Sequence, residues 1–490
     1  MRCKMKYYKK LEKLMEKWNS LYGASMVLHW DKRTMMPIRS HLLRSEQISL
    51  LSTMQHEILA SQEITELLNC IDITQLNDWQ KANMREIYRL HTMATQIPEN
   101  LVNRLTQATM KCEKVWHLQA NQTDQQALEK SFEELITLTR EMAYSFGDSL
   151  NISAYDALLE QHQPGLRDHF ILPIFNQIES FTANFTSIRN RLPKEKNNWP
   201  IIPKYQQQKF AKKLMLEMKF DFRTGRLDES VHPFTGGISG DIRVCSYFKP
   251  DNIILSISAI MHEMGHASYE SRLPRQFRGQ PVGDSRGMCI HEGIALLFEK
   301  KIGHSSEYLE YLSKKLNKQF GYLNYFSKEK LLHHFNTVRR SGIRVSADDF
   351  TYPAHILIRY KIEKELISGE LSVKNLNNRW RDLYNLYLGI APSLHEGPWQ
   401  DIHWAAGYFG YFPCYLIGNV ISSQLFNKAE KEFSIKNEIS QGKFDKIQKW
   451  LSEKIYKKSS YYEFEDLILS SCGKSLSADD FINNLKERLH

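Results

Sequence analysis

The chain has 490 residues, of which 42% are hydrophobic and 25% are charged, the ordinary balance of a globular protein rather than a disordered or fibrous one. Its net charge of +9 comes from 65 basic and 56 acidic residues scattered in short clusters, so we expect no nucleic-acid partner. The sequence contains no apolar run long enough to cross a bilayer, so we expect no membrane-spanning segment.

The cysteines and the start of the chain indicate a cytoplasmic protein. The seven cysteines are widely spaced and form no CxxC pair, which is typical of free thiols in a reducing compartment. The first ten residues are basic, but no apolar signal-peptide core follows them. The apolar residues that follow recur at the spacing of an amphipathic helix: Leu11, Leu14, Met15, Trp18, Leu21 and Tyr22.

Helical periodicity dominates the chain and predicts a mainly α fold of helices packed on helices. Residues 4–190 are periodic, with breaks at Pro37, at Pro98 and around residues 163–165. The polar, proline-bearing segment 192–200 is the best candidate for an internal boundary. We therefore predict one domain over residues 1–490, with a helical half at 1–190, a catalytic core at 200–425 and helices at 426–490.

One region lacks helical periodicity. The glycine-rich stretch from His232 to Gly240 reads as a loop that feeds a single β-strand beginning at Asp241. Alternation places Asp241 and Arg243 on the same side of that strand. The two residues could line a substrate groove or form a structural ion pair, and spacing alone does not decide between these interpretations.

A short motif in the middle of the chain carries the clearest chemical signal. The stretch His262-Glu263-Met264-Gly265-His266 is an HExxH pattern that follows an apolar run. On a helix, residues four apart share a face, so His262 and His266 can bind one cation. Glu263 lies beside them and suits a general base acting on a metal-bound water. An exposed charged helix face is the alternative, but the apolar run makes unpartnered polar groups costly there.

A second apolar segment, 287–299, carries the pair His291-Glu292. Glu292 follows His266 by 26 residues, which leaves room for a turn and for the return of an antiparallel helix. Arg272 stands where the third histidine of the metzincin pattern would be. We therefore predict a His-His-Glu metal site with Glu292 as the third ligand.

Two further features could belong to a binding site. Arg359 lies among isoleucines and leucine, so it is either paired inside the fold or meets an anionic ligand, and the residues alone favour pairing. The stretch 397–413 combines glycines and aromatic residues with Gln400, Asp401 and His403, a mixture typical of a site wall.

Five motifs occur in a characteristic order along the chain. They are His232-Pro233-Phe234, Asp241-x-Arg243, His262-Glu263-Met264-Gly265-His266, His291-Glu292 and Gly397-x-x-Gln400-Asp401-x-His403-Trp404. Together they resemble the HExxH zinc metallocarboxypeptidases of the thermostable carboxypeptidase Taq family over essentially the whole chain. The resemblance implies a mainly helical, saddle-shaped fold with a deep central groove and a small β-sheet at its edge, usually in a homodimer. It also implies a hydrolase that releases single residues from peptide C-termini with broad specificity.

The resemblance assigns roles to individual residues. It implies that His262, His266 and Glu292 bind Zn2+, with Co2+ also acceptable to this ligand set. It makes Glu263 the general base. The remaining roles are an oxyanion contact from His403 and Tyr411, and substrate contacts from Arg359, Arg243, Asp241, Tyr408 and Gln400. The implied partners are therefore peptides with a free C-terminus.

The chain departs from the family pattern at three positions. Cys245 stands where the family normally has threonine, and Gly293-Ile294 replaces a Ser-Gln pair after the second His-Glu. The loss of a glutamine amide beside a metal ligand could lower metal affinity or rate. Two alternatives therefore stay open: a catalytically weakened peptide-binding protein, and a dipeptidase or oligopeptidase on the same scaffold.

Overall fold

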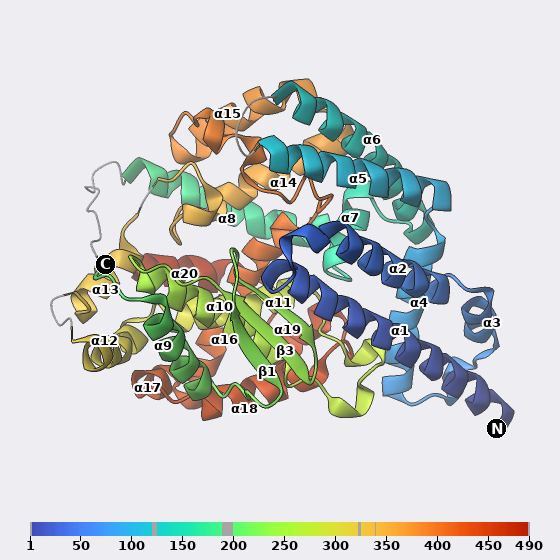
Figure 1. Ribbon diagram of the computed structural model, residues 1–490, viewed down its shortest axis with the longest axis horizontal. Coiled ribbons are helices and arrows are strands. Elements are labelled where there is room, and N and C mark those ends of the chain that lie inside the picture. The colour runs from blue at the N-terminus through green and yellow to red at the C-terminus, as the bar shows by residue number, and fades with distance from the viewer. Residues whose placement is uncertain (1, 120–124, 189–198, 322–324, 339, 489–490) are drawn as a thin grey trace.

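The computed structural model describes residues 2–119, 125–188, 199–321, 325–338 and 340–488, and helices dominate it (Figure 1). The helices of the N-terminal part are α1 (Arg2–Thr34), α2 (His41–Leu59), α3 (Gln62–Cys70), α4 (Asp78–Thr95), α5 (Glu99–Gln119), α6 (Gln125–Leu150), α7 (Ala154–His162) and α8 (Asp168–Ile188). The predicted breaks at Pro37, Pro98 and 163–165 fall between these helices and are confirmed. Residues 192–198 of the predicted boundary segment lie outside the described ranges, and the division into parts stays a prediction.

The rest of the chain adds a second set of helices around a small sheet. The helices of this part are α9 (Lys204–Glu217), α10 (Ile253–Glu270), α11 (Met288–Leu296), α12 (Ser306–Phe320), α13 (Lys328–Asn336), α14 (Tyr352–Ser368), α15 (Leu376–Leu388), α16 (Phe412–Phe433), α17 (Ile435–Ser440), α18 (Asp445–Lys454), α19 (Phe464–Cys472) and α20 (Asp479–Glu487). A π-helical segment, η5 (Leu297–Ile302), continues α11 directly. Within the described ranges, no helix combines the length and apolar character needed to cross a bilayer.

The sheet has three strands where the sequence predicted one. The strands are β1 (Gly225–Glu229), β2 (Phe234–Ile238) and β3 (Asp241–Ser246). Their order is β1-β3-β2, with β1 parallel and β2 antiparallel to β3. The prediction of a loop over 232–240 was wrong because the two-residue turn Ser239-Gly240 closes a hairpin that pairs Ile238 with Asp241. Glycines in a strand hide it from propensity-based prediction.

The metal-motif helix α10 lies in the middle of the molecule, beside β2 and β3 (Figure 1). Asn252 caps it by accepting a hydrogen bond from the backbone N–H of Leu255 at 3.1 Å. Apolar residues on all sides then bury the helix, as its sequence predicts. A Cβ atom on Gly265 would lie 2.4 Å from Cα of Ala295, so only glycine at this position allows α11 to pack so close to α10.

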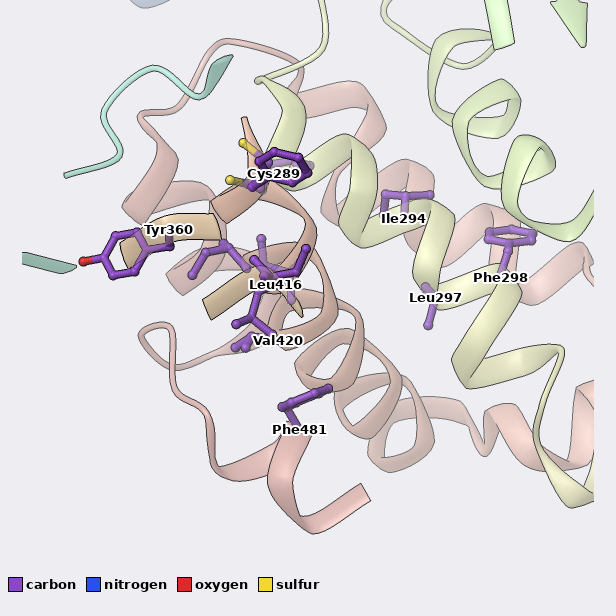
Figure 2. Close-up of a cluster of buried hydrophobic side chains, with 14 of the residues drawn as sticks. Cys289, Ile294, Leu297, Phe298, Tyr360, Leu416, Val420 and Phe481 are labelled. Atoms are coloured by element: carbon purple, nitrogen blue, oxygen red, sulfur yellow. The ribbon is translucent and has the colours of Figure 1, made fainter. Parts of the chain in front are cut away.

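A continuous hydrophobic core holds α11 and α16 together beneath the motif. Figure 2 shows part of it, with labelled residues from α11, η5, α14, α16 and α20: Cys289, Ile294, Leu297, Phe298, Tyr360, Leu416, Val420 and Phe481. These side chains are at most 2% exposed. Their burial fixes the position of the helix that carries Glu292.

Candidate metal centre and active site

His262, His266 and Glu292 converge on one point. Each offers a ligand atom, and the three atoms lie within 4.8 Å of one another. The Nε2 atoms of His262 and His266 are 3.2 Å apart. Glu292 places its carboxylate oxygens 3.8 Å from Nε2 of His262 and 4.0 Å from Nε2 of His266. Two imidazole nitrogens and a carboxylate in this arrangement can hold one divalent cation.

The local structure explains this convergence. His262 and His266 lie one turn apart on α10, and the contact of Gly265 with Ala295 brings α11 close enough for Glu292 to reach them. The spacing of 26 residues between His266 and Glu292 is spanned by short 3₁₀ turns and no long helix. The predicted helix, turn and second helix are therefore present.

The polar groups of this cluster fit a bound cation. Oε2 of Glu292 is buried and has no hydrogen-bond partner among the described residues. A buried carboxylate oxygen left in this state costs free energy, and a cation would remove that cost. Burial raises the pKa of Glu292 and lowers that of His266 well below its ordinary value. The low pKa keeps the ring of His266 neutral, as a metal ligand requires.

Glu263 lies next to the ligands but points to a different partner. Its Oε2 accepts a hydrogen bond of 2.7 Å from Oγ1 of Thr235 on β2. The side chain is buried, and burial raises its pKa to about 7, against the opposing effects of His262 and Thr235. A carboxylate whose pKa lies near neutrality can take up and release a proton at physiological pH, as a general base must.

Thr235 is a residue that the sequence did not predict to act in the site. It immediately follows the His232-Pro233-Phe234 motif, and that motif could have drawn attention to Thr235. Oγ1 of Thr235 also lies 3.0 Å from the backbone oxygen of Glu263, so its single hydrogen is shared between the two acceptors. These two contacts tie the hairpin to the motif helix.

The site opens into a cavity of about 780 Å³. Its walls come from α1, α4, the β2 hairpin, α10 and the start of α16, and they include the metal-site residues and Glu263. Tyr22 of α1 and Tyr411 beside α16 contribute aromatic surface. A cavity of this volume accommodates several residues of an extended peptide.

Tyr411 and Tyr415 both line the cavity, and Tyr415 makes the closer link to His403. The hydroxyl of Tyr415 is 3.2 Å from Nε2 of His403. Burial and the charge of Arg344 lower the pKa of His403 to about 3, so its ring is neutral. The sequence missed Tyr415, although it lies four residues after Tyr411 and thus on the same side of a helix.

Neither Arg359 nor Gln400 lines the cavity. Arg359 is 1% exposed and donates to Oδ2 of Asp401 through Nε and Nη2, at 2.8 and 2.6 Å. Arg344, which the sequence did not single out, binds the other oxygen of Asp401 at 2.8 and 2.9 Å. Gln400 accepts a hydrogen bond from the backbone N–H of Arg344. The structure therefore favours internal pairing of Arg359 over contact with substrate.

The other three residues predicted to bind substrate are also absent from the cavity wall. Asp241 and Arg243 pair with each other at 2.9 Å. The guanidinium of Arg243 lies 4.4 Å from the ring centroid of Trp30, so it helps to dock α1 on the sheet. Tyr408 is half exposed outside the cavity lining. The geometry supports the ion-pair interpretation of Asp241 and Arg243, and a substrate role for all three stays a prediction.

The unusual Gly293-Ile294 pair is accommodated by its neighbours. A Cβ atom on Gly293 would lie 2.7 Å from Cγ2 of Ile421, so the side chain of Ile421 occupies the space that a serine would need. Ile294 is completely buried in the core of Figure 2. Cys245 is likewise buried, and burial raises the pKa of its thiol to about 12. These departures leave the metal ligands in place.

Comparisons with known proteins point to one family. The family model described as Carboxypeptidase Taq (M32) metallopeptidase matches residues 10–489. Thermostable carboxypeptidase 1 of Thermus thermophilus is 31% identical and that of Pyrococcus furiosus is 30% identical, each over 98% of both chains. Among solved structures, metallocarboxypeptidase 1 of Trypanosoma cruzi superposes with a TM-score of 0.94 at 29% identity, covering 99% of this chain and 100% of that one.

Proposed function

The chain belongs to the carboxypeptidase Taq (M32) metallopeptidase family, and we propose that it removes single amino acids from peptide C-termini at a cation held by His262, His266 and Glu292. The protein is thus a metallocarboxypeptidase that acts on peptides. The convergence of the three ligand atoms within 4.8 Å is the observation that carries the residue assignment.

Zinc is the cation that this ligand set suits best. Two imidazoles and one carboxylate are a common catalytic zinc set, and cobalt accepts the same ligands. Once bound, the cation acts as a Lewis acid that polarises the scissile carbonyl and makes water more acidic. Oε2 of Glu292 has no hydrogen-bond partner in the part of the chain that the structure describes, which supports a ligand role for that residue.

Glu263 acts as the general base in this proposal. It receives the proton of the attacking water and then delivers it to the amine that leaves as the C–N bond breaks. The hydrogen bond from Thr235 keeps the carboxylate in one orientation. The raised pKa allows Glu263 to hold the proton between the two steps.

The developing oxyanion needs hydrogen-bond donors. We propose that the hydroxyl of Tyr415 or Tyr411 supplies one. Nε2 of His403 lies 3.2 Å from the hydroxyl of Tyr415 and orients it. Tyr415→Phe and Tyr411→Phe test this assignment. The loss of a single oxyanion donor lowers kcat by about 10²–10³-fold with little change in KM.

A carboxypeptidase must also recognise a free carboxylate, and arginine does this with two parallel bonds. Arg359 and Arg243 were the sequence-based candidates, but their guanidinium groups are engaged with Asp401 and Asp241. Arg278 and Arg89 line the cavity and extend the candidate set, and of these Arg89 already donates through Nε to Oε2 of Glu86 at 3.1 Å. A KM increase in Arg278→Gln or Arg89→Gln, absent in Arg243→Gln, would identify the residue that binds the carboxylate.

We also propose a homodimer and a cytoplasmic location. The dimer rests on the family resemblance, and light scattering of the purified protein tests it. The location rests on the thiols at Cys70, Cys112, Cys245, Cys289, Cys414 and Cys472, which form no disulfides.

The test of the proposed activity is a mass-spectrometric time course with two N-terminally blocked peptides of the same sequence. One peptide ends in a free carboxylate and the other in an amide. We expect stepwise loss of single residues from the free acid and slow or no cleavage of the amide. Release of dipeptides, or internal cleavage of both peptides, would contradict the exopeptidase assignment.

A further inference from the structure

The two histidine ligands present one ring nitrogen to the metal position and the other to a second set of side chains. Their Nε2 atoms face each other at 3.2 Å. Nδ1 of His262 is 2.9 Å from Oε2 of Glu299, and Nδ1 of His266 is 2.6 Å from Nδ1 of His291. None of Glu299, His291 and Glu270 was assigned a role by the sequence motifs. Their geometry determines which nitrogen of each ligand carries hydrogen.

When Nε2 of His262 binds a cation, only one position of the ring hydrogen is consistent with the contact to Glu299. A metal-binding nitrogen uses its lone pair, so the hydrogen must be on Nδ1. Nδ1–H of His262 then donates to the carboxylate of Glu299. This bond holds the ring in the orientation that binding requires and makes Nε2 a better electron donor.

The second ligand, His266, is linked to the carboxylate of Glu270 through the ring of His291. Nδ1–H of His266 can donate to Nδ1 of His291 only if that nitrogen accepts, so His291 carries its hydrogen on Nε2. That Nε2 is 2.8 Å from Oε1 of Glu270. Glu270 lies four residues after His266, on the same face of α10. The hydrogen-bonded series therefore runs from His266 through His291 to Glu270.

The backbone around Glu299 departs from α-helical geometry. Glu299 lies in the π-helical segment η5, and π-helical turns recur at functional sites. The next residue, Lys300, pairs with Asp349 at 2.8 Å, and Asp349 also accepts a hydrogen bond from Arg488 at 2.7 Å. These contacts anchor the residue that follows Glu299.

We propose that Glu299 and Glu270 are positioning residues for the metal centre, with Glu299 orienting His262 directly and Glu270 orienting His266 through His291. The proposal rests on the proposed metal ligands. It makes metal affinity, rather than peptide binding, the property that these two carboxylates control.

The experiment measures the zinc dissociation constant of the full-length protein by competition with a chromophoric chelator. The variants are Glu299→Gln, Glu270→Gln, Glu292→Gln and the control Glu310→Gln, whose side chain is on the surface and pairs with Lys314. Removing a hydrogen-bond partner of a metal-bound histidine weakens metal binding by about 10–100-fold. We expect a loss in this range for Glu299→Gln, a smaller loss for Glu270→Gln and no change for Glu310→Gln.

A second readout separates positioning from a structural role. We expect the visible absorption spectrum of cobalt-loaded Glu299→Gln to differ from that of wild type, because the orientation of His262 changes, while far-UV circular dichroism stays the same. If Glu299→Gln does not fold, Glu299→Asp keeps the charge and withdraws the carboxylate by one methylene, and we expect the same direction of change.

Wild-type zinc affinity in either Glu299→Gln or Glu270→Gln, together with a large loss in Glu292→Gln, would overturn the role of that residue while leaving the metal site intact. Wild-type affinity in Glu292→Gln would instead overturn the proposed ligand set itself. The two failures are therefore distinguishable.

Discussion

Two buried polar clusters lie close together in this molecule, and they are completed in different ways. In the cluster of Arg344, Arg359 and Asp401, both carboxylate oxygens accept hydrogen bonds from guanidinium groups. In the cluster of His262, His266 and Glu292, a buried carboxylate oxygen has no hydrogen-bond partner among the described residues. The first cluster is complete within the protein, whereas the second needs a ligand. This difference separates a structural ion-pair network from a functional site more clearly than burial or charge does.

Metal removal should have the largest effect and should act on one cluster only. We expect dialysis against a chelator to abolish peptidase activity and added zinc or cobalt to restore it, because the cation is required for the chemistry. Circular dichroism should show that the helical content of the apoprotein is unchanged, since the arginine cluster and the core do not depend on metal. Full activity of demonstrably metal-free protein would remove the distinction between the clusters.

Asp401→Asn should affect the other cluster and act through stability. Removing one partner of a buried ion pair typically costs about 3–5 kcal/mol because the remaining charges stay buried without compensation. We therefore expect a clear fall in Tm by differential scanning fluorimetry with zinc affinity little changed. A variant as stable as wild type would show that the pairing of Arg344 and Arg359 is not structural.

The stability that Asp401 contributes should depend on pH. Burial opposes ionisation of Asp401, but the charges of Arg359 and Arg344 hold its pKa below the ordinary value of 3.8. A lowered carboxyl pKa in the folded state contributes stability above the unfolded pKa, and that contribution is lost as pH falls through the folded pKa. The Tm difference between wild type and Asp401→Asn should thus be constant at neutral pH and decrease only below about pH 4.

Gly293→Ser, which restores the family residue, should destabilise this chain. The new Cβ atom would meet Cγ2 of Ile421 at 2.7 Å, and overpacking of this kind costs about 1–3 kcal/mol. We expect Ile421→Ala to relieve the contact, so that the double variant is more stable than the sum of the two single changes predicts. Additive changes in a thermal unfolding series would show that the two positions are independent.

Thr235→Val should change catalysis alone and leave stability and metal binding as they are. The substitution keeps the shape of the side chain but removes the hydroxyl that donates to Glu263. The loss of one hydrogen bond to a charged group costs about 1.5–3 kcal/mol. We expect kcat to fall by roughly tenfold to a hundredfold at unchanged zinc affinity, and an altered zinc affinity would instead place Thr235 among the groups that support the metal.

The sequence predicted the convergence of His262, His266 and Glu292 because the signal is local. His262 and His266 are one helical turn apart, and Glu292 is separated from them by a single turn region. The mainly helical fold was predicted from periodicity for the same reason. The hairpin strand β2 was missed because Gly236 and Gly237 have low strand propensity, and only pairing with β3 makes them a strand.

The contacts that sequence reasoning could not identify join residues distant in the chain. The residues alone favoured pairing of Arg359, but its partner Asp401 is 42 residues away and could not be identified by spacing. Glu299 was missed because its contact with His262 spans 37 residues and depends on a π-helical turn. Tyr415 was overlooked in favour of Tyr411, because only the structure shows which hydroxyl lies near His403. Local periodicity carries none of these contacts.

The most direct test of the catalytic assignment is the turnover of Glu263→Gln under conditions in which its bound zinc is measured in the same sample. Glu263 is not a ligand here, so we predict stoichiometric zinc, an unchanged thermal midpoint and a fall in kcat of about 10²–10⁴-fold, the usual contribution of a general base. Wild-type turnover by the zinc-loaded variant would contradict the account, because another group would then have to take the proton.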